Sequence, residues 1–268
     1  MKTVVITGSA RGLGLEMAKV FKENNASVII SDLNEDALVK SEEELNKIKS
    51  SSVVKHCVCD VTKTKDIESL IKFAKDEFGK IDIWINNAGV NQPEDAIWDL
   101  TEEEINLVLD VDLKGAINAS RLVMKEMIKE GSGAIYNVEG YGSNDAMMLG
   151  LSIYGTSKRA ITYFTQALAK ESEVKNTGVI IGRLSPGIMI TDFIVTALGD
   201  KGKIELPEKT KKVYNILGDY PDVVAKFLVE SMLNNTKNNA HIEWLTSRKA
   251  AFRFMTAGFN KRDFFKEK

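Results

Sequence analysis

Residues 2–14 read Lys2-Thr3-Val4-Val5-Ile6-Thr7-Gly8-Ser9-Ala10-Arg11-Gly12-Leu13-Gly14. The β-branched run predicts a buried strand over Lys2–Thr7, and the pattern that follows predicts a helix from about Leu13 to Glu23. Glycines between the two permit a tight turn and a close approach of the backbone, and amides at a helix start favour phosphate. A turn without a ligand is the simpler alternative. The stretch predicts a pyrophosphate site formed by Gly8, Arg11, Gly12, Leu13 and Gly14.

Apolar, strand-like segments recur along the chain and alternate with amphipathic, helix-like ones. The strand-like segments are Ser27–Ser31, Val53–Val58, Ile81–Ile85, Ala134–Val138, Val179–Leu184 and Ala240–Leu245. This alternation is typical of a parallel sheet covered by helices. No linker rich in Pro, Gly or Ser and no internal repeat divides the chain. We therefore expect one α/β domain over residues 1–268, a Rossmann-type, doubly wound parallel sheet of about seven strands.

Two long helices and a shorter one are predicted in the second half of this pattern. Thr101-Glu102-Glu103-Glu104 has the spacing of a capping box and predicts one helix that continues to about Glu130. A second long helix is expected from about Ser152 to Val174. A shorter helix should follow Pro221, because proline fits the first helical turn.

Two segments of the C-terminal part have less regular patterns. Residues 192–217 contain glycines, a proline and many lysines, and we interpret them as an irregular insertion that covers the substrate. Residues 247–268 form a tail of aromatic and basic residues. Packing of these aromatics on the domain or on a second subunit is favoured, and a membrane-surface or partner-binding helix is the alternative.

Composition is that of an ordinary globular protein of 268 residues, with 44% hydrophobic residues and a formal net charge of −2. This charge gives no reason to expect a nucleic acid or an anionic membrane as partner. No apolar run approaches the roughly 20 residues that span a bilayer, and no signal peptide is recognisable, so a cytoplasmic location is expected. Cys57 and Cys59 are predicted to be buried thiols, and with His56 and His241 isolated no metal site is expected.

Asp32 ends the second predicted strand and adds to the evidence for a dinucleotide. An acidic side chain at this place can accept hydrogen bonds from the adenosine ribose hydroxyls. It would also repel a 2′-phosphate, so NAD is favoured over NADP. Arg11 would weaken that preference if it bound phosphate, but it is equally well explained as a solvated cation.

With these features the sequence resembles the short-chain dehydrogenase/reductase family. The family's motifs match, in chain order, Thr7–Gly14, Asp60-Val61, Asn86-Asn87-Ala88-Gly89, Tyr154-Gly155-Thr156-Ser157-Lys158 and Ser185-Pro186-Gly187-Ile188-Met189-Ile190-Thr191. The resemblance implies that Asp60 and Val61 lie near the adenine. It also implies that the cofactor contacts Asn87, Ala88, Gly89, Pro186, Gly187, Ile188 and Thr191.

Tyr154 and Lys158 are spaced so that a helix places both side chains on one face. An ammonium beside a phenol favours the phenolate and so assists proton transfer. A structural pair on a helix is the alternative. The family resemblance implies that Tyr154 is the acid/base, and that Lys158 supports it and holds the nicotinamide ribose.

Two positions depart from the family's pattern. Asp112 stands where the family has an asparagine of a proton relay; it can accept the same hydrogen bonds, but its charge would oppose phenolate formation. Gly140 stands where the family has its catalytic serine, and Ser143 is the candidate replacement, with Tyr141 or Asn144 as alternative donors to the substrate carbonyl.

The altered loop Asn137-Val138-Glu139-Gly140-Tyr141-Gly142-Ser143 is locally similar to the chlorophyll b reductase-like subgroup. This likeness does not identify the substrate. We expect hydride transfer between NAD(H) and a secondary alcohol or ketone, by a homodimer or homotetramer as the family implies. The alternatives are a catalytically impaired NAD-binding sensor or scaffold and a membrane-peripheral reductase of a large hydrophobic substrate.

Overall fold

The computed structural model describes residues 1–189, 208–259 and 262–265. Its centre is a seven-stranded sheet of order β3-β2-β1-β4-β5-β6-β7, in which all neighbouring strands are parallel. The strands are β1 (Thr3–Thr7), β2 (Ser27–Asp32), β3 (Val54–Val58), β4 (Ile83–Asn86), β5 (Gly133–Val138), β6 (Val179–Ser185) and β7 (Ala240–Glu243). The strand order reverses between β1 and β4, where sheets of this type bind ligands. The predicted Rossmann-type, single-domain fold is confirmed.

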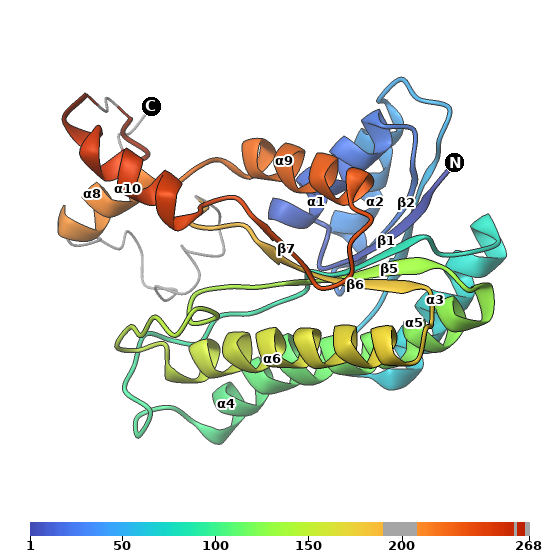
Figure 1. Ribbon diagram of the computed structural model, residues 1–268, viewed down its shortest axis with the longest axis horizontal. Coiled ribbons are helices and arrows are strands. Elements are labelled where there is room, and N and C mark those ends of the chain that lie inside the picture. The colour runs from blue at the N-terminus through green and yellow to red at the C-terminus, as the bar shows by residue number, and fades with distance from the viewer. Residues whose placement is uncertain (190–207, 260–261, 266–268) are drawn as a thin grey trace.

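Helices cover both faces of this sheet (Figure 1). One layer contains α1 (Gly12–Glu23), α2 (Glu35–Asn46) and α9 (Pro221–Asn234). The other contains α3 (Thr64–Phe78), α4 (Glu102–Val108), α5 (Ala116–Glu130) and α6 (Ser152–Val174). A hydrophobic core lies between the sheet and each layer of helices, and alternate residues of β1 pack into the two cores. Val4 and Ile6 pack with the first layer, and Val5 packs with the second.

Strand ends differ slightly from the prediction. β4 begins at Ile83 rather than at Ile81, and the preceding Asp82 uses its carboxylate to accept the Thr3 amide at 2.8 Å. β7 ends at Glu243 rather than at Leu245, because Thr246 already caps the following helix through the Lys249 amide.

The helix predicted from Thr101 to Glu130 is a continuous run with a change of pitch inside it. The capping box at Thr101 is present, but the segment Leu109–Gly115 between α4 and α5 is π-helical. Gly115 ends that segment close to the loop after β3, since a Cβ added there would lie 3.0 Å from the carbonyl oxygen of Val61. π-Helical turns inside α-helices are frequent at functional sites, and this one carries Asp112.

The predicted irregular insertion lies mostly in 190–207, outside the described residues. Its last part, Glu208–Leu217, is helix α8, which corrects the expectation of irregular structure there. The spacing of Val213, Ile216 and Leu217 suits a helix, and the neighbouring glycines and proline obscure it.

The predicted tail contains helix α10 (Ser247–Met255) and a 3₁₀ turn (Ala257–Phe259). Helices α8 and α10 lie together at one end of the molecule (Figure 1). Phe264 packs edge-on against Tyr220 with ring centroids 5.0 Å apart, whereas Phe252 and Phe259 are 61% and 88% exposed. The expectation that the tail's aromatics pack on the domain therefore holds for only some of them.

The two cysteines differ in their burial. Cys59 is buried, but Cys57 is only half-buried, because it lies on β3 at the edge of the sheet. The described residues contain no cluster of His, Cys, Asp and Glu suited to a metal ion. In the same residues, no helix has both the length and the apolar character required to cross a membrane.

Candidate active site

The glycine-rich turn after β1 has the backbone shape that a pyrophosphate requires. Gly8 has φ +62°, and a Cβ there would lie 2.6 Å from Ala88 Cα. A Cβ at Gly14 would lie 2.5 Å from the carbonyl oxygen of Gly8. Gly12 also has a positive φ, +60°, at the start of α1. The turn therefore depends on glycine at these positions, and it presents the first amides of α1, with Leu13 among them, to a ligand.

Asn87 joins this turn to the end of β4. Its Nδ2 donates to the carbonyl oxygens of Thr7 at 3.0 Å and Gly8 at 2.7 Å. The hydroxyl of Thr7 accepts from the amides of Asn87 and Ala88, both at 3.1 Å. Two of the segments that the sequence predicts to hold the cofactor are thus fixed against each other.

Asp32 lies beside the same turn, at the end of β2. Its Oδ2 accepts the Ala10 amide at 3.3 Å and its Oδ1 accepts the Leu33 amide at 2.8 Å. The carboxylate is partly exposed, which leaves room for a ribose diol. Arg11 is exposed at the N-cap of α1, where its side chain makes no capping bond.

Asp60 begins the loop after β3, with Val61 buried behind it. Its Oδ1 accepts from the amide and hydroxyl of Thr62, and its Oδ2 pairs with Lys63 at 3.1 Å. Burial raises the pKa of Asp60, but these bonds outweigh it and leave the pKa below its ordinary value. The carboxylate is therefore anionic. An adenine ring bound beside Asp60 would meet a carboxylate that is already bonded to Thr62 and Lys63.

Tyr154 and Lys158 lie one turn apart on α6, as predicted, and both are buried. The Lys158 Nζ lies 5.4 Å from the centre of the Tyr154 ring. Burial raises the pKa of Tyr154 above its ordinary value; the charge of Lys158 lowers it and the charge of Asp112 raises it further. The phenol is therefore held in its protonated form near neutral pH.

Asp112 forms a buried ion pair with Lys158, 2.8 Å between Oδ2 and Nζ. Its other oxygen accepts the Val90 amide at 2.7 Å. Burial raises the pKa of Asp112, although Lys158 opposes the rise. Burial also lowers the pKa of Lys158, but the charge of Asp112 outweighs it and leaves that pKa raised. Gly89 lies beside this pair: a Cβ there would lie 3.4 Å from Asp112 Oδ1 and from Lys158 Nζ, which is ordinary van der Waals contact.

Gly140 lies directly against the reactive group of Tyr154. A Cβ at Gly140 would lie 2.3 Å from the Tyr154 hydroxyl oxygen, so no other residue fits unless the ring moves. The Ser143 hydroxyl accepts the Gly140 amide at 3.2 Å and donates to the Lys158 carbonyl at 3.3 Å. These two bonds tie the loop to α6, and the role of Ser143 as a donor to a substrate carbonyl stays a prediction.

Pro186, Gly187 and Ile188 follow β6 at the same edge of the sheet. Gly187 has φ +74°, and a Cβ there would lie 2.8 Å from the Leu245 Cβ. The Ile188 carbonyl accepts the Asp219 amide at 3.0 Å. Thr191, the last predicted contact of this segment, lies outside the described residues.

Glu139 precedes Gly140 and is a site residue that the sequence analysis does not select. It is 5% exposed, yet its oxygens accept from the hydroxyls of Thr162 and Ser185 and lie 3.1 Å from His241 Nε2. Burial raises the pKa of Glu139, but these bonds outweigh it and set the pKa at about 2. Glu139 thereby connects the end of β5 to Ser185 at the end of β6, to His241 of β7 and to Thr162 in the middle of α6. In the sequence, a carboxylate at the end of an apolar strand is the signal that could have predicted a buried, hydrogen-bonded residue here.

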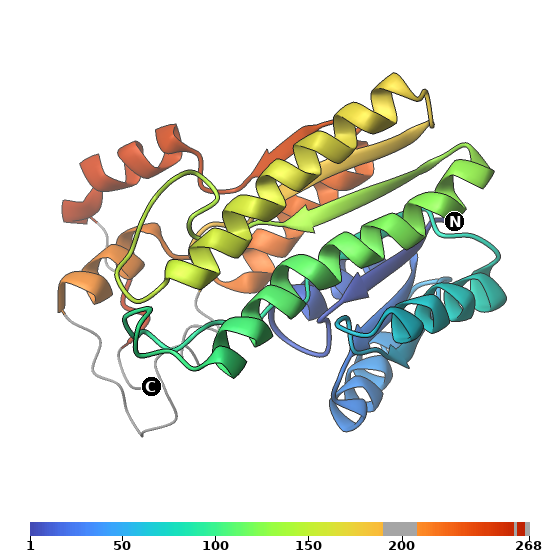
Figure 2. The same cartoon turned by 90° about the horizontal axis from the view of Figure 1, so that it is seen from below.

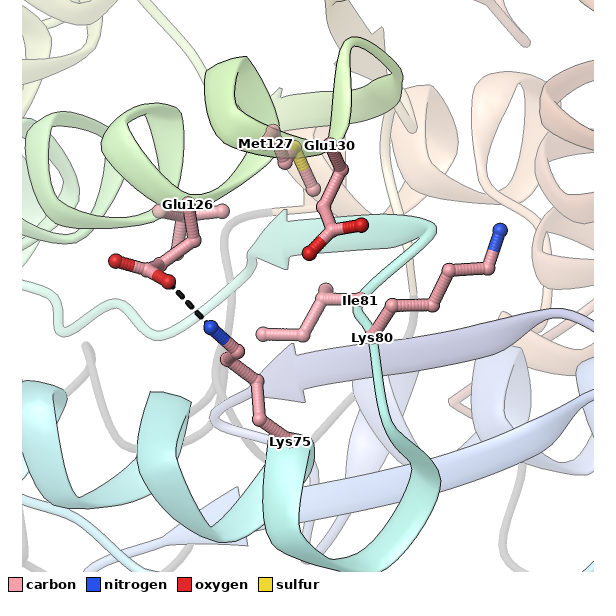
Figure 3. A pocket seen from close by; sticks show the side chains of 7 residues that line it. Lys75, Lys80, Ile81, Glu126, Met127 and Glu130 are labelled. Carbon is pink, nitrogen blue, oxygen red and sulfur yellow. Dashed lines mark hydrogen bonds and ion pairs between the residues drawn. The ribbon is translucent and has the colours of Figure 1, made fainter.

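A pocket between α3 and α5 lies away from this site (Figure 3). Lys75 of α3 pairs there with Glu126 of α5, and Ile81 lines it just before β4 begins. The amino end of β4 is opposite the edge where the motifs meet. A volume of about 10 Å³ holds no more than a single water.

Comparisons with known proteins agree with this geometry. The model of the family described as short chain dehydrogenase matches residues 2–200. A probable chlorophyll(ide) b reductase, chloroplastic, from Oryza sativa subsp. japonica is 29% identical over 99% of this chain and 54% of its own length. Its counterpart from Arabidopsis thaliana is 30% identical over 98% and 54%. The chain thus spans about half the length of these relatives.

A bacterial relative and several solved structures match more of their own length. An uncharacterized oxidoreductase of Mycobacterium bovis is 32% identical over 77% of this chain and 82% of its own. Levodione reductase has a TM-score of 0.81 at 23% identity, covering 93% of this chain and 98% of that one. NAD⁺-bound xylitol dehydrogenase has a TM-score of 0.79 at 22% identity, covering 91% and 97%.

Actinorhodin polyketide ketoreductase, solved with NADPH, has a TM-score of 0.80 at 22% identity, covering 92% of this chain and 97% of that one. At these identities the structures show a shared fold, and their cofactors differ. The family match, the sheet order and the arrangement of Tyr154 and Lys158 lead to one conclusion: the chain belongs to the short-chain dehydrogenases, a family of oxidoreductases that bind a nicotinamide dinucleotide.

Proposed function

We propose that this protein transfers hydride between NAD(H) and a ketone or secondary alcohol, with Tyr154 as the acid/base and Lys158 as its support. The observation that carries this proposal is the buried Tyr154–Lys158 pair on α6, with the phenol oxygen against Gly140 at the carboxyl end of β5. A sensor that only binds nucleotide has less need of a tyrosine and a lysine buried together at this place.

The cofactor would occupy the edge where β1, β4 and β6 end. The turn Gly8–Gly14 fits a pyrophosphate because its glycines leave the space that side chains would fill. Asp60 and Val61 would border the adenine, and Asn87, Ala88, Gly89, Pro186, Gly187 and Ile188 the remainder. When bound, the nicotinamide supplies the hydride chemistry. The protein's own residues orient the two reactants, exclude water and move one proton.

Preference for NAD over NADP is supported by Asp32. Its carboxylate is partly exposed beside the turn, accepts amide hydrogens and has no cationic partner among the described contacts. A 2′-phosphate would bring a second negative charge to this place. Exposed Arg11 follows Ala10, whose amide bonds to Asp32, and a contact of Arg11 with phosphate would reduce the preference.

Proton transfer in the reductive direction follows from the state of Tyr154. Its raised pKa keeps the phenol protonated at neutral pH, so the hydroxyl can donate to a carbonyl oxygen as hydride reaches the carbonyl carbon. The resulting phenolate is stabilised by Lys158, which remains a cation because Asp112 raises its pKa. Asp112 therefore favours the protonated form of Tyr154 before proton transfer. After transfer it keeps Lys158 charged, and the Lys158 ammonium stabilises the Tyr154 phenolate.

Titrations of NADH and NADPH, followed by cofactor oxidation with a panel of ketones, test this proposal. We expect tighter binding of NADH, turnover in the wild type, and turnover lost in Tyr154→Phe with NADH binding retained. Asp32→Ala should lose the preference for NADH. Binding without turnover on any ketone would favour the sensor or scaffold alternative, and binding of neither nucleotide would contradict the central claim.

A bulky apolar substrate is a second, narrower proposal. Met147 and Leu149, in the loop between β5 and α6, are 93% and 97% exposed, and Trp98, in the loop after β4, is 83% exposed. These loops meet at Gly150, whose added Cβ would lie 2.9 Å from the Glu94 carbonyl carbon. The relatives named chlorophyll(ide) b reductase agree with a large substrate. Higher kcat/KM for bulky than for short-chain ketones, reduced in Trp98→Ser, would support the proposal; equal values would oppose it.

A further inference from the structure

Helix α6 carries Tyr154 in its first turn but does not cap that turn itself. Its N-cap residue, Leu151, makes no side-chain capping bond. The first amides of a helix have no partners within the helix, and a buried helix start needs acceptors from elsewhere. Here the acceptor comes from Gln92, about sixty residues earlier in the chain.

The side chain of Gln92 makes its hydrogen bonds at the start of α6 and in the loop before it. Its Oε1 accepts the amides of Ile153 and Tyr154, both at 2.8 Å, and its Nε2 donates to the Gly150 carbonyl at 2.8 Å. The residue is 1% exposed. One side chain therefore fixes both the first turn of α6 and the loop that leads into it.

The short segment that contains Gln92 also contacts the other parts of the site. Asn87, at its start, holds the glycine-rich turn through two carbonyls, and the Val90 amide donates to Asp112. Gln92, at its end, holds the backbone of Tyr154. Six residues of chain, Asn87–Gln92, thus connect the pyrophosphate turn, the buried ion pair and the acid/base.

We propose that Gln92 is a positioning residue for Tyr154, which holds the first turn of α6 so that the phenol is aligned for proton transfer. This rests on the proposed function. Misalignment of a reacting group by about 1 Å lowers rates by up to about 100-fold, so loss of the bonds should reduce kcat more than cofactor affinity. The amide's neutrality also matters, because a carboxylate there would add a negative charge to the turn that contains Tyr154.

The test uses two substitutions of Gln92 and one matched control. Gln92→Met keeps the length of the side chain and removes all three bonds. Gln92→Glu keeps an acceptor, loses the donor and adds a charge. Gln166→Met makes the same change at an exposed position of the same helix. The measurements are NADH affinity, kcat per NADH-binding site, KM and the pKa of Tyr154. This pKa is obtained from the carbon-13 resonance of Tyr154 Cζ, which is assigned because it is absent from the spectrum of Tyr154→Phe.

We expect Gln92→Met to lower kcat at least about tenfold, with NADH affinity within about twofold of wild type. Gln92→Glu should raise the pKa of Tyr154 by about half a unit, in the same direction as the charge of Asp112 and against that of Lys158. Gln166→Met should match wild type. A purely structural cap predicts that Gln92→Met has a lower melting temperature with kcat per site and the Tyr154 pKa unchanged, and that result would overturn the proposal.

The resonance titration separates this inference from the proposed function. If no ketone is turned over by the wild type, the dehydrogenase proposal fails while the Tyr154 resonance still reports its environment. An unchanged Tyr154 pKa in Gln92→Glu then overturns the role of Gln92. A shifted pKa in Gln92→Met, which adds no charge, with an unshifted one in Gln166→Met, supports it without any turnover.

Discussion

The pairing of Asp112 with Lys158 is the residue-scale feature that distinguishes this site from the family's pattern. An asparagine could bond to the same groups but could not balance a buried ammonium. The pair is nearly inaccessible, with side-chain exposures of 0% for Asp112 and 7% for Lys158. Breaking a buried pair leaves one charge without compensation, which costs about 3 to 5 kcal/mol.

Asp112→Asn should therefore destabilise the protein by about 3 kcal/mol and lower the pKa of Tyr154. The sign follows from the cause: the charge of Asp112 raises that pKa, so its removal lowers it. Ketone reduction needs the protonated phenol, so its alkaline decline should move to lower pH. Urea unfolding and pH–rate profiles measure the two effects.

Asp110→Asn is the matched control for this change. Asp110 lies in the same π-helical segment but is 43% exposed and pairs with exposed Lys114. Its loss should change stability by less than about 1 kcal/mol and leave the pH–rate profile in place. Equal effects of the two substitutions would contradict the role assigned to the buried pair.

Glu139 predicts an acid-dependent loss of stability. Its pKa is lowered to about 2 in the folded protein, so it stabilises the fold above its unfolded pKa of about 4.3 and loses this contribution as pH falls toward 2. Wild type should lose on the order of 3 kcal/mol from this group across that window. In urea unfolding at pH 5 and pH 3, Glu139→Gln should show a smaller difference than wild type. The exposed-site control Glu43→Gln should keep the full difference, and a full difference in Glu139→Gln would exclude this role.

At the scale of elements, the site depends on the contact between the loop after β5 and the first turns of α6. Figure 2 shows α6, in yellow, beside α5, in green, with the loop that precedes α6 at one end of the helix. Gly140 makes that contact possible because its backbone lies against the Tyr154 hydroxyl. The loop that departs from the family's pattern thus packs closely against Tyr154, and its glycine is required for that contact.

Gly140→Ala should displace the Tyr154 ring and lower kcat by at least about tenfold, because the added Cβ would lie 2.3 Å from the hydroxyl oxygen. Gly155→Ala is the control: its added Cβ would meet nothing nearer than 3.9 Å, on the same helix. It should retain activity and gain about 0.5 to 1 kcal/mol from helix propensity. Steady-state kinetics and thermal unfolding compare the two, and equal activity would show that the contact is dispensable.

At the scale of the whole molecule, much of the fold was predictable because it is encoded locally. The β-branched run before Gly8, the carboxylate of Asp32 and the apolar strand segments fix the sheet and its switch point. The expected positions of Tyr154 and Lys158 on one helix face follow from periodicity alone. Contacts between distant segments were not predictable: the cap from Gln92 and the hydrogen bonds of Glu139 and Ser143 all depend on packing through space.

Assembly is a further whole-molecule prediction. We expect a homodimer or homotetramer. Helix α6 is the candidate interface, because it is a long helix on the outside of its layer and its Tyr163 is 75% exposed. Sedimentation at micromolar concentration should show the oligomer, and Tyr163→Asp should shift it toward monomer. A wild-type monomer under these conditions would contradict the prediction.

Transfer of deuterium from NADH that carries deuterium at both hydrogen positions of nicotinamide C4 tests the central claim most directly. Ketones from the panel are incubated with the labelled cofactor, and the alcohols are analysed by mass spectrometry. The account predicts deuterium on the new carbinol carbon with wild type and none with Tyr154→Phe, although both bind NADH. Bound NADH with no labelled alcohol from any ketone, or equal labelling by Tyr154→Phe, would contradict it.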